Sequence, residues 1–177
     1  MRVSENKAVV LLSEQLALAC GYDCNKAKEI GIAAALHDVG KKYTPTHILE
    51  KPEKLTSDEF EIIKQHTKIG YTMLSSMVSK IGKMAKLAAL MHHEYFNGKG
   101  YWGIPSQKLP NYIGIISIAD VFCALVSPYR PYKQSWSPDE ATQYIKEQAG
   151  EQFSPELVNI FMKLIRANKC VSAIFMQ

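Results

Sequence analysis

The sequence lacks the features that mark membrane-spanning and secreted proteins. No apolar run approaches the ~18 residues that a membrane helix needs, and the first residues lack the layout of a secretory signal. The four cysteines, at positions 20, 24, 123 and 170, show neither a paired zinc spacing nor the density of a disulfide scaffold. We therefore expect a cytoplasmic protein with reduced thiols and no membrane partner.

A strong charge of one sign is also absent. The net charge is +4, and the basic residues are spread along the chain rather than gathered in a block. A protein built to bind duplex nucleic acid usually shows a basic stripe, so we expect no such partner, whereas a small anionic substrate is compatible with the mild excess. The hydrophobic share of 47% and the length of 177 residues predict one domain over residues 1–177. The sequence leaves the oligomeric state undefined.

Apolar residues recur at helical spacing almost throughout, and we predict a single all-α bundle of roughly seven helices. The run Ile115–Ile118 is the only strand candidate, and its helical continuation on both sides argues against a strand. The helix start signals are a cap at Asn25, capping boxes at Thr56 and Ser137, and Ser154 before a proline. The pattern also predicts a turn over 46–50, a helix over about 83–93, a long glycine-rich loop over 95–110 and a buried central helix over 112–126.

Four of the five histidines stand in a series with two aspartates: His37, Asp38, His66, His92, His93 and Asp120. Imidazole nitrogen and carboxylate oxygen are ligands of divalent metals. Neighbours on a helix point about 100° apart, yet near a helix end both can lean toward a common point. Six groups from four helices exceed one four-coordinate site, so they predict two metals bridged by a carboxylate, which share a hydroxide and clamp phosphoryl oxygens.

Each of these residues also has a structural interpretation. A single histidine on an apolar helix, such as His66 taken alone, is more often a hydrogen-bonded core residue than a ligand. His47 has no partner in the pattern, and we expect it at the surface or at the rim of the pocket. Asp120 is stronger evidence for a site, because a carboxylate inside the apolar run 113–126 is costly to bury unpaired.

These residues lie in segments that resemble the HD-GYP family, a branch of the HD-domain metal-dependent phosphohydrolases. The resemblance covers about residues 8–165. It rests on the segments AALHDVGK (34–41), ILEKPEKLT (48–56), HTKIG (66–70), HHEYFNGKGY (92–101), IADVF (118–122), RPYK (130–133) and AGEQFSP (149–155).

The resemblance implies hydrolysis of cyclic di-GMP to the linear dinucleotide or GMP, with two or three iron or manganese ions. It implies that the six residues above are the ligands, with Asp38 bridging and Lys41 beside the scissile phosphate. Carried over in the same way, Tyr101 contacts a guanine or ribose, while Arg130 and Lys133 hold the phosphates or the guanine edge. Domains of this family are commonly fused to receiver or sensor domains; we recognise none here, and a signalling protein is a further candidate partner.

The chain departs from the family pattern at four positions. Trp102 replaces the proline of the glycine-rich motif, and it either stacks on guanine or packs on the bundle. Cys123 replaces an aspartate, Gly114 replaces an arginine, and Glu5 falls near the place of a histidine that often adds a ligand.

Three functions follow: a cyclic dinucleotide phosphodiesterase, an HD phosphohydrolase of another nucleotide or phosphoester, or a degenerate domain that binds a ligand or partner without turnover. The complete ligand set disfavours the third, and the substrate-side residues Tyr101, Arg130 and Lys133 favour the first over the second.

Overall fold

The computed structural model describes residues 3–128 and 135–167. These residues form eight α-helices and two short 3₁₀ helices, and no strand is found among them. The elements in chain order are α1 (Val3–Ala19), α2 (Cys24–Leu36), η1 (Val39–Tyr43), α3 (Thr46–Leu49), α4 (Ser57–Leu74), α5 (Lys80–Met91), η2 (Ser106–Lys108), α6 (Asn111–Val126), α7 (Pro138–Glu147) and α8 (Pro155–Ala167). The predicted all-α class is confirmed, and the strand candidate Ile115–Ile118 is helical.

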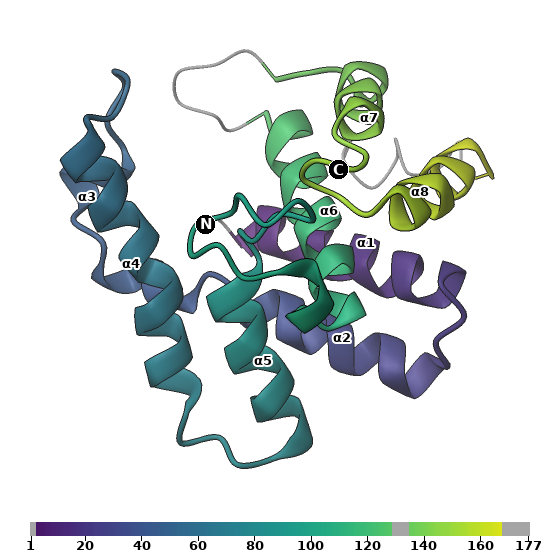
Figure 1. Cartoon of the computed structure of the whole chain (residues 1–177), viewed down its shortest axis with the longest axis horizontal. Coiled ribbons are helices and arrows are strands. Elements are labelled where there is room, and N and C mark those ends of the chain that lie inside the picture. Colours follow the sequence, from purple (N-terminus) through teal and green to yellow (C-terminus); the bar gives the residue numbers. More distant parts are fainter. Residues whose placement is uncertain (1–2, 129–134, 168–177) are drawn as a thin grey trace.

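Helix α6 runs through the middle of the molecule (Figure 1). Its residues are buried on nearly all sides, including Ile115, Ile116 and Phe122. A helix that is apolar on every face is most stable when every face is packed away from water. Helix α1 packs against α2, α6 and α8, and α5 packs against α2, α4 and α6. Asp120 is thereby carried to a largely buried position on a mainly apolar helix. Within the described ranges, no helix is both long and apolar enough to cross a bilayer.

The capping signals are confirmed at two helices. Thr56 accepts a hydrogen bond from the backbone N–H of Glu59, whose carboxylate accepts one from the N–H of Thr56. Ser137 and Glu140 make the same reciprocal pair at α7, with a proline at the first helical position. Each pair satisfies two backbone donors that the first helical turn cannot pair by itself.

Three local expectations were wrong. The cap of α2 is Asp23, whose side chain accepts from the N–H of Lys26; Asn25 lies inside the first turn instead. Ser79 caps α5, so this helix begins three residues before the expected position 83. The expected turn over 46–50 is the short helix α3. At the starts of α2 and α5 several short polar residues lie close together, and the sequence pattern alone does not select the one that caps the helix.

Gly40 permits a close approach that positions the first aspartate of the series. A Cβ atom at this residue would lie 1.9 Å from the carbonyl oxygen of His66 and 2.6 Å from the backbone nitrogen of Gly70. Both obstacles are backbone atoms, which cannot rotate away. The absence of a side chain at Gly40 therefore lets η1 rest directly on α4, with Asp38 beside His66.

We expect Gly40→Ala to lower the free energy of unfolding by at least ~2 kcal/mol, because the new methyl group must push η1 away from α4. Thermal or urea unfolding measures the change. The matched control is Gly31→Ala, for which the three atoms nearest to the new Cβ all belong to the flexible side chain of Glu14; this variant should stay within ~1 kcal/mol of wild type. Equal stability of the two variants would contradict the role given to Gly40.

Candidate metal centre

The structure brings all six predicted ligands to one place in the bundle. His37 is the C-cap of α2, and Asp38 follows it at the start of η1. His92 is the C-cap of α5, and His93 follows it. The other two come from inside α4 and α6: His66 and Asp120. Helix ends let adjacent residues point toward one centre, which is the geometry that the adjacent pairs predicted.

Three of the imidazole rings are oriented by the same kind of contact. In each ring, Nδ1 lies against a carbonyl oxygen one turn earlier in its own helix; the pairs are His37 with Ala34 at 2.5 Å, His66 with Ile63 at 2.6 Å, and His92 with Ala88 at 2.9 Å. A carbonyl oxygen can only accept, so Nδ1 is the protonated nitrogen that donates. Nε2 is therefore the ring nitrogen that faces the centre and is available to a metal, as in most metal-binding histidines.

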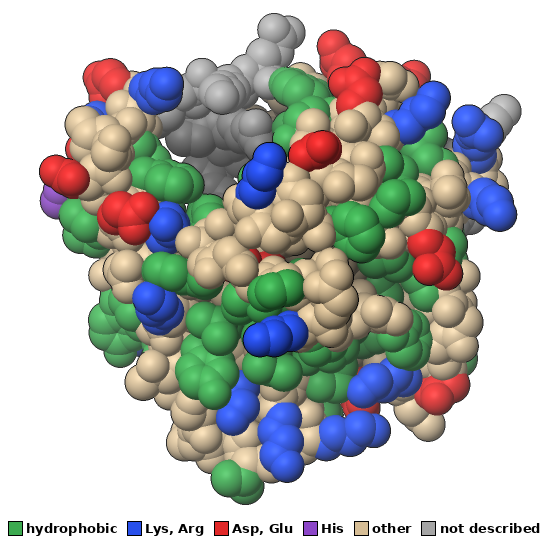
Figure 2. Space-filling view, viewed as in Figure 1, with side chains coloured by type: hydrophobic (Ala, Val, Ile, Leu, Met, Phe, Trp, Pro, Cys, Tyr) green, Lys and Arg blue, Asp and Glu red, His purple; other side chains and the backbone are tan. Residues whose placement is uncertain are grey.

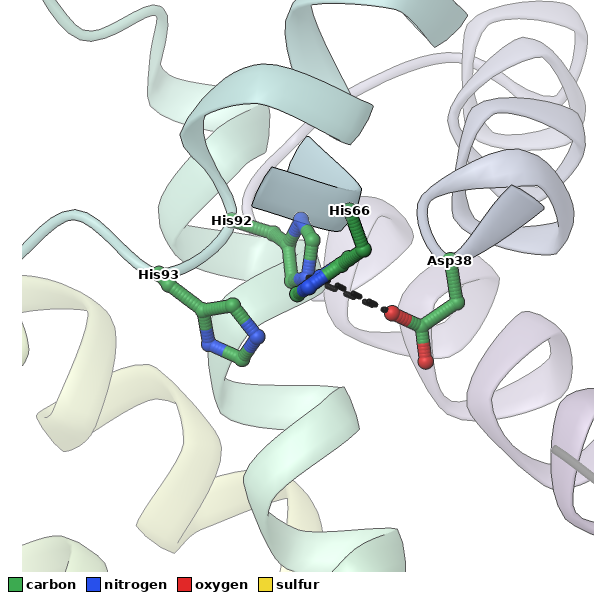
Figure 3. Close-up of side chains that lie close together, drawn as sticks. All are labelled: Asp38, His66, His92 and His93. Atoms are coloured by element: carbon green, nitrogen blue, oxygen red, sulfur yellow. Dashed lines mark hydrogen bonds and ion pairs between the residues drawn. The ribbon is translucent and has the colours of Figure 1, made fainter. Parts of the chain in front are cut away.

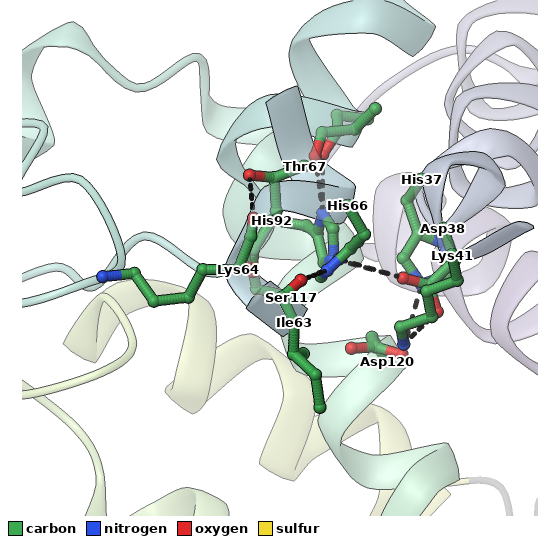
Figure 4. A network of polar contacts seen from close by, with 12 residues as sticks. His37, Asp38, Lys41, Ile63, Lys64, His66, Thr67, His92, Ser117 and Asp120 are labelled. Atoms are coloured by element: carbon green, nitrogen blue, oxygen red, sulfur yellow. Dashed lines mark hydrogen bonds and ion pairs between the residues drawn. The ribbon is translucent and has the colours of Figure 1, made fainter. Parts of the chain in front are cut away.

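The Asp38 carboxylate lies between two groups of ligand atoms. Its Oδ1 is 3.3 Å from Nε2 of His66 and 3.6 Å from Nε2 of His92, and His93 completes this first group (Figure 3). Its Oδ2 is 3.4 Å from Nε2 of His37, which is 3.3 Å from Oδ1 of Asp120 in the second group (Figure 4). Two ligand atoms ~2.1 Å from one ion at a tetrahedral angle are about 3.4 Å apart. Each group therefore has the spacing of ligands around one cation, and Asp38 belongs to both.

Two buried atoms at this centre test whether the residues fit a metal. Nε2 of His37 and Oδ1 of Asp38 are buried and have no hydrogen-bond partner among the described residues. A buried polar atom without a partner costs free energy. A cation held between these atoms satisfies both, so the residues fit a divalent metal. The structure thus carries a His/Asp cluster that could bind metal ions.

The pKa values show that the cluster attracts positive charge. Burial alone would lower the pKa of His37, but the carboxylates of Asp38 and Asp120 outweigh it and raise the pKa to about 10. A metal that binds Nε2 of His37 would therefore displace a proton from it. Burial also opposes ionisation of Asp38 and Asp120, and His37 nevertheless holds the pKa of both carboxyls below the ordinary value. Burial, followed by the neighbouring His92, keeps the pKa of His93 well below its ordinary value. The carboxylates thus stay charged and His93 stays neutral, which are the forms that ligate metals.

Lys41 places a fixed cation beside the cluster. Its ammonium donates a hydrogen bond to Oδ2 of Asp38. Burial would lower the pKa of Lys41, but Asp38 and Asp120 raise it above the ordinary value. The side chain is 27% exposed, so a protonated ammonium faces both the cluster and the solvent.

Tyr101 lies against the histidine cluster. Its ring centroid is 4.4 Å from that of His93, and its backbone N–H donates to the carbonyl oxygen of His93. Burial raises the pKa of the Tyr101 phenol to about 12, so the phenol keeps its proton at neutral pH. Tyr101 therefore presents a neutral aromatic wall beside the cluster, and the contact with a guanine or ribose that the resemblance implies stays a prediction.

Trp102 packs on the bundle. Its indole N–H donates to Oγ1 of Thr67 at 2.9 Å, and the ammonium of Lys68 lies 3.5 Å from its ring centroid. Of the two interpretations left open for this residue, the geometry favours packing on α4 over stacking on a guanine. Arg130 and Lys133 lie outside the described residues, as does the side chain of Glu5. His47 is exposed, as expected.

Glu94 is a structural residue of the site that the sequence did not identify. It is 3% exposed, and its two oxygens accept from the backbone N–H groups of Trp102 at 2.8 Å and Ile104 at 2.9 Å. Gly100 allows this clamp, because a Cβ there would lie 2.4 Å from the Cα of Glu94. The carboxylate thereby ties the glycine-rich loop to the end of α5. The sequence places Glu94 directly after His92 and His93. This position could have drawn attention to Glu94, but the pattern was interpreted only in terms of the two histidines.

The fold and this site define an all-α protein with a His/Asp cluster in which one carboxylate, Asp38, belongs to two groups of candidate ligands. The chain belongs to the HD domain family, which matches residues 2–157.

Two curated relatives and one solved structure refine this assignment. The chain is 43% identical over 154 residues to the cyclic di-GMP phosphodiesterase of Thermotoga maritima, covering 86% of this chain and 42% of that protein. It is 40% identical over 154 residues to the cyclic di-GMP phosphodiesterase response regulator RpfG of Xanthomonas campestris, covering 86% of this chain and 39% of that protein. It thus spans about two fifths of the length of each.

The solved structure is Bd1817, an HDG"Y"P protein from Bdellovibrio bacteriovorus. It superposes with a TM-score of 0.72 at 17% identity, over 92% of this chain and 51% of that chain. At this identity, the likeness describes the fold. The resemblance to the HD-GYP branch, predicted from the seven segments, is confirmed by these comparisons.

We expect Glu94→Gln to loosen the glycine-rich loop, because an amide offers one acceptor oxygen where the carboxylate offers two. Hydrogen exchange at the backbone amides of Trp102 and Ile104 should quicken, with a loss of ~1–3 kcal/mol in stability. The matched control is Glu151→Gln. Glu151 is an exposed carboxylate that accepts a hydrogen bond from Nδ2 of the loop residue Asn97 at 2.6 Å, and its replacement should leave the amides of Trp102 and Ile104 protected. Unchanged exchange in Glu94→Gln would show that the clamp does not hold the loop.

Proposed function

We propose that this chain is the catalytic domain of a metal-dependent phosphodiesterase that hydrolyses cyclic di-GMP to the linear dinucleotide or GMP. The observation that carries the proposal is the Asp38 carboxylate, which belongs to both groups of ligand atoms. The curated relatives named above, both cyclic di-GMP phosphodiesterases by name, support the choice of substrate. The proposal treats residues 1–177 as one phosphohydrolase domain.

We further propose two divalent transition metals, with iron or manganese as the ions and a third ion as a variant. His66, His92, His93 and Asp38 would hold one ion, and the second would lie among the residues His37, Asp38 and Asp120. Bound metals supply Lewis-acid stabilisation of phosphate oxygens and a nucleophile generated from water at neutral pH. Mixed nitrogen and oxygen donors suit iron and manganese.

The chain's own residues position and neutralise the substrate. The protonated ammonium of Lys41, held by Asp38, would donate to a non-bridging oxygen of the scissile phosphate and offset its growing charge. Tyr101, seated on His93 by its ring contact, would close one side of the site and exclude water. Arg130 and Lys133 are proposed to hold the second phosphate or a guanine edge, as the family resemblance implies.

Two other functions are distinguished by one assay. The metal-loaded protein is incubated anaerobically, under reducing conditions, with cyclic di-GMP, cyclic di-AMP or bis(p-nitrophenyl) phosphate, and the products are separated. The proposal expects cyclic di-GMP to give linear dinucleotide or GMP. Cleavage of another phosphodiester without cyclic di-GMP would support a phosphohydrolase of different specificity, and bound metal without turnover would support a degenerate binding domain.

We expect the purified protein to carry at least two transition-metal ions per chain, and Asp38→Ala to lose both ions together with hydrolytic activity. The reason is that one carboxylate serves both ligand groups. Elemental analysis gives the metal content. His47→Ala is the matched control, because His47 is an exposed histidine outside the cluster and should keep the full complement. Full metal occupancy in Asp38→Ala would contradict the proposal that the Asp38 carboxylate serves both ions.

A further inference from the structure

One stripe of α4 faces the glycine-rich loop and carries an exposed aromatic ring. Phe60, Lys64 and Lys68 are spaced four residues apart, so they lie along one side of the helix. The ring of Phe60 meets that of Tyr101 edge to face, with centroids 5.6 Å apart and planes at 81°. Tyr101 in turn lies 4.4 Å from His93. A continuous aromatic path therefore leads from the metal centre outward along α4.

Phe60 is the outer end of this path. It is 43% exposed and lies about 9 Å along the helix axis from His66, six residues further on. At the left of Figure 2, the side of the molecule that carries α4 in Figure 1, hydrophobic side chains lie among charged side chains of both signs. A single exposed apolar residue needs no explanation, but an exposed ring continuous with the wall of the candidate site offers a face for a planar ligand.

Lys64 adds a cation to the same surface. Its ammonium lies 5.9 Å from the ring centroid of Phe60, 5.9 Å from that of Tyr101 and 5.0 Å from that of Trp102. It also pairs with Glu61 at 2.9 Å, a carboxylate on the exposed surface. Three aromatic faces hold this charge in place, and the ammonium has further protons to donate.

We propose that Phe60 and Lys64, together with Tyr101, form an outer subsite that binds a guanine base of the dinucleotide. The proposal rests on the proposed function and adds α4 to its binding surface. The Phe60 ring stacks on the base, and base–aromatic stacking is sequence-tolerant because every base has a π-face. Lys64 supplies the choice of base, because an ammonium only donates and guanine presents two neighbouring acceptors, O6 and N7, where adenine presents an amino donor beside N7.

The first test measures binding of cyclic di-GMP by calorimetry, separately from hydrolysis. Phe60→Ala should raise the Kd at least about fivefold, the factor that corresponds to the lower range of stacking on one base. Phe60→Trp, which keeps an aromatic face, should stay within about twofold of wild type. Ile62→Ala is the matched control: Ile62 is also exposed, at 41%, but its side chain points about 200° away around the helix, so this variant should bind as wild type does.

The second test compares ligands in Lys64→Met, which keeps the apolar stem and removes the charge. The ratio of cyclic di-GMP to cyclic di-AMP affinity should fall at least about fivefold. In both Phe60→Ala and Lys64→Met, the metal content should match wild type, because neither side chain belongs to the His/Asp cluster.

The outcomes separate this subsite from the proposed function. Unchanged cyclic di-GMP affinity in Phe60→Ala, an equal loss in Ile62→Ala, or an unchanged base preference in Lys64→Met would overturn the subsite while leaving the activity in place. Binding that depends on Phe60 and Lys64 without any hydrolysis would support the subsite and overturn the phosphodiesterase. A wild-type protein that binds no cyclic di-GMP would overturn both.

Discussion

A carboxylate buried among imidazole rings is stable only if positive charge is held beside it, and Asp38 is in this position. Its side chain is 5% exposed, and its two oxygens face different sets of neighbours: His66 and His92 on one side, His37 and Lys41 on the other. The packing of α2, η1, α4 and α5 around this carboxylate makes it the point where the elements meet. Because Asp38 belongs to both groups of candidate ligands, this one carboxylate links them into a single cluster.

Backbone atoms of the surrounding helices hold the side chains of the cluster in place. Gly40 brings η1 against α4, and carbonyl oxygens of the helices hold the imidazole rings by Nδ1. The hydroxyl of Ser117 donates to the carbonyl oxygen of His92 at 2.6 Å and so joins the end of α5 to the central helix. Glu94 extends the same principle to the loop that carries Tyr101. Backbone anchoring holds each imidazole ring by Nδ1 and leaves Nε2 facing the centre, where it is available to a metal ion. A site whose groups are held in this way is preorganised.

The fold class and the convergence of the adjacent pairs of candidate ligands could be predicted from the sequence because their signals are local. Capping boxes at Thr56 and Ser137 act within four residues, and the adjacent pairs His37–Asp38 and His92–His93 require only a helix end to converge. Features that depend on packing between distant segments could not be predicted. The contacts of Glu94 with the loop, of Trp102 with α4, and of Phe60 with Tyr101 each need the loop 95–110 placed against α4, and no spacing in the sequence encodes that placement.

Anomalous X-ray diffraction from manganese-loaded crystals tests the central claim most directly, because it locates each ion independently of activity. The account predicts two peaks about 3.5–4 Å apart, with the Asp38 carboxylate between them. One peak should lie against His66, His92 and His93, and the other should lie against His37 and Asp120. A single peak that uses only one of the two groups, or two peaks that share no contact with Asp38, would contradict it.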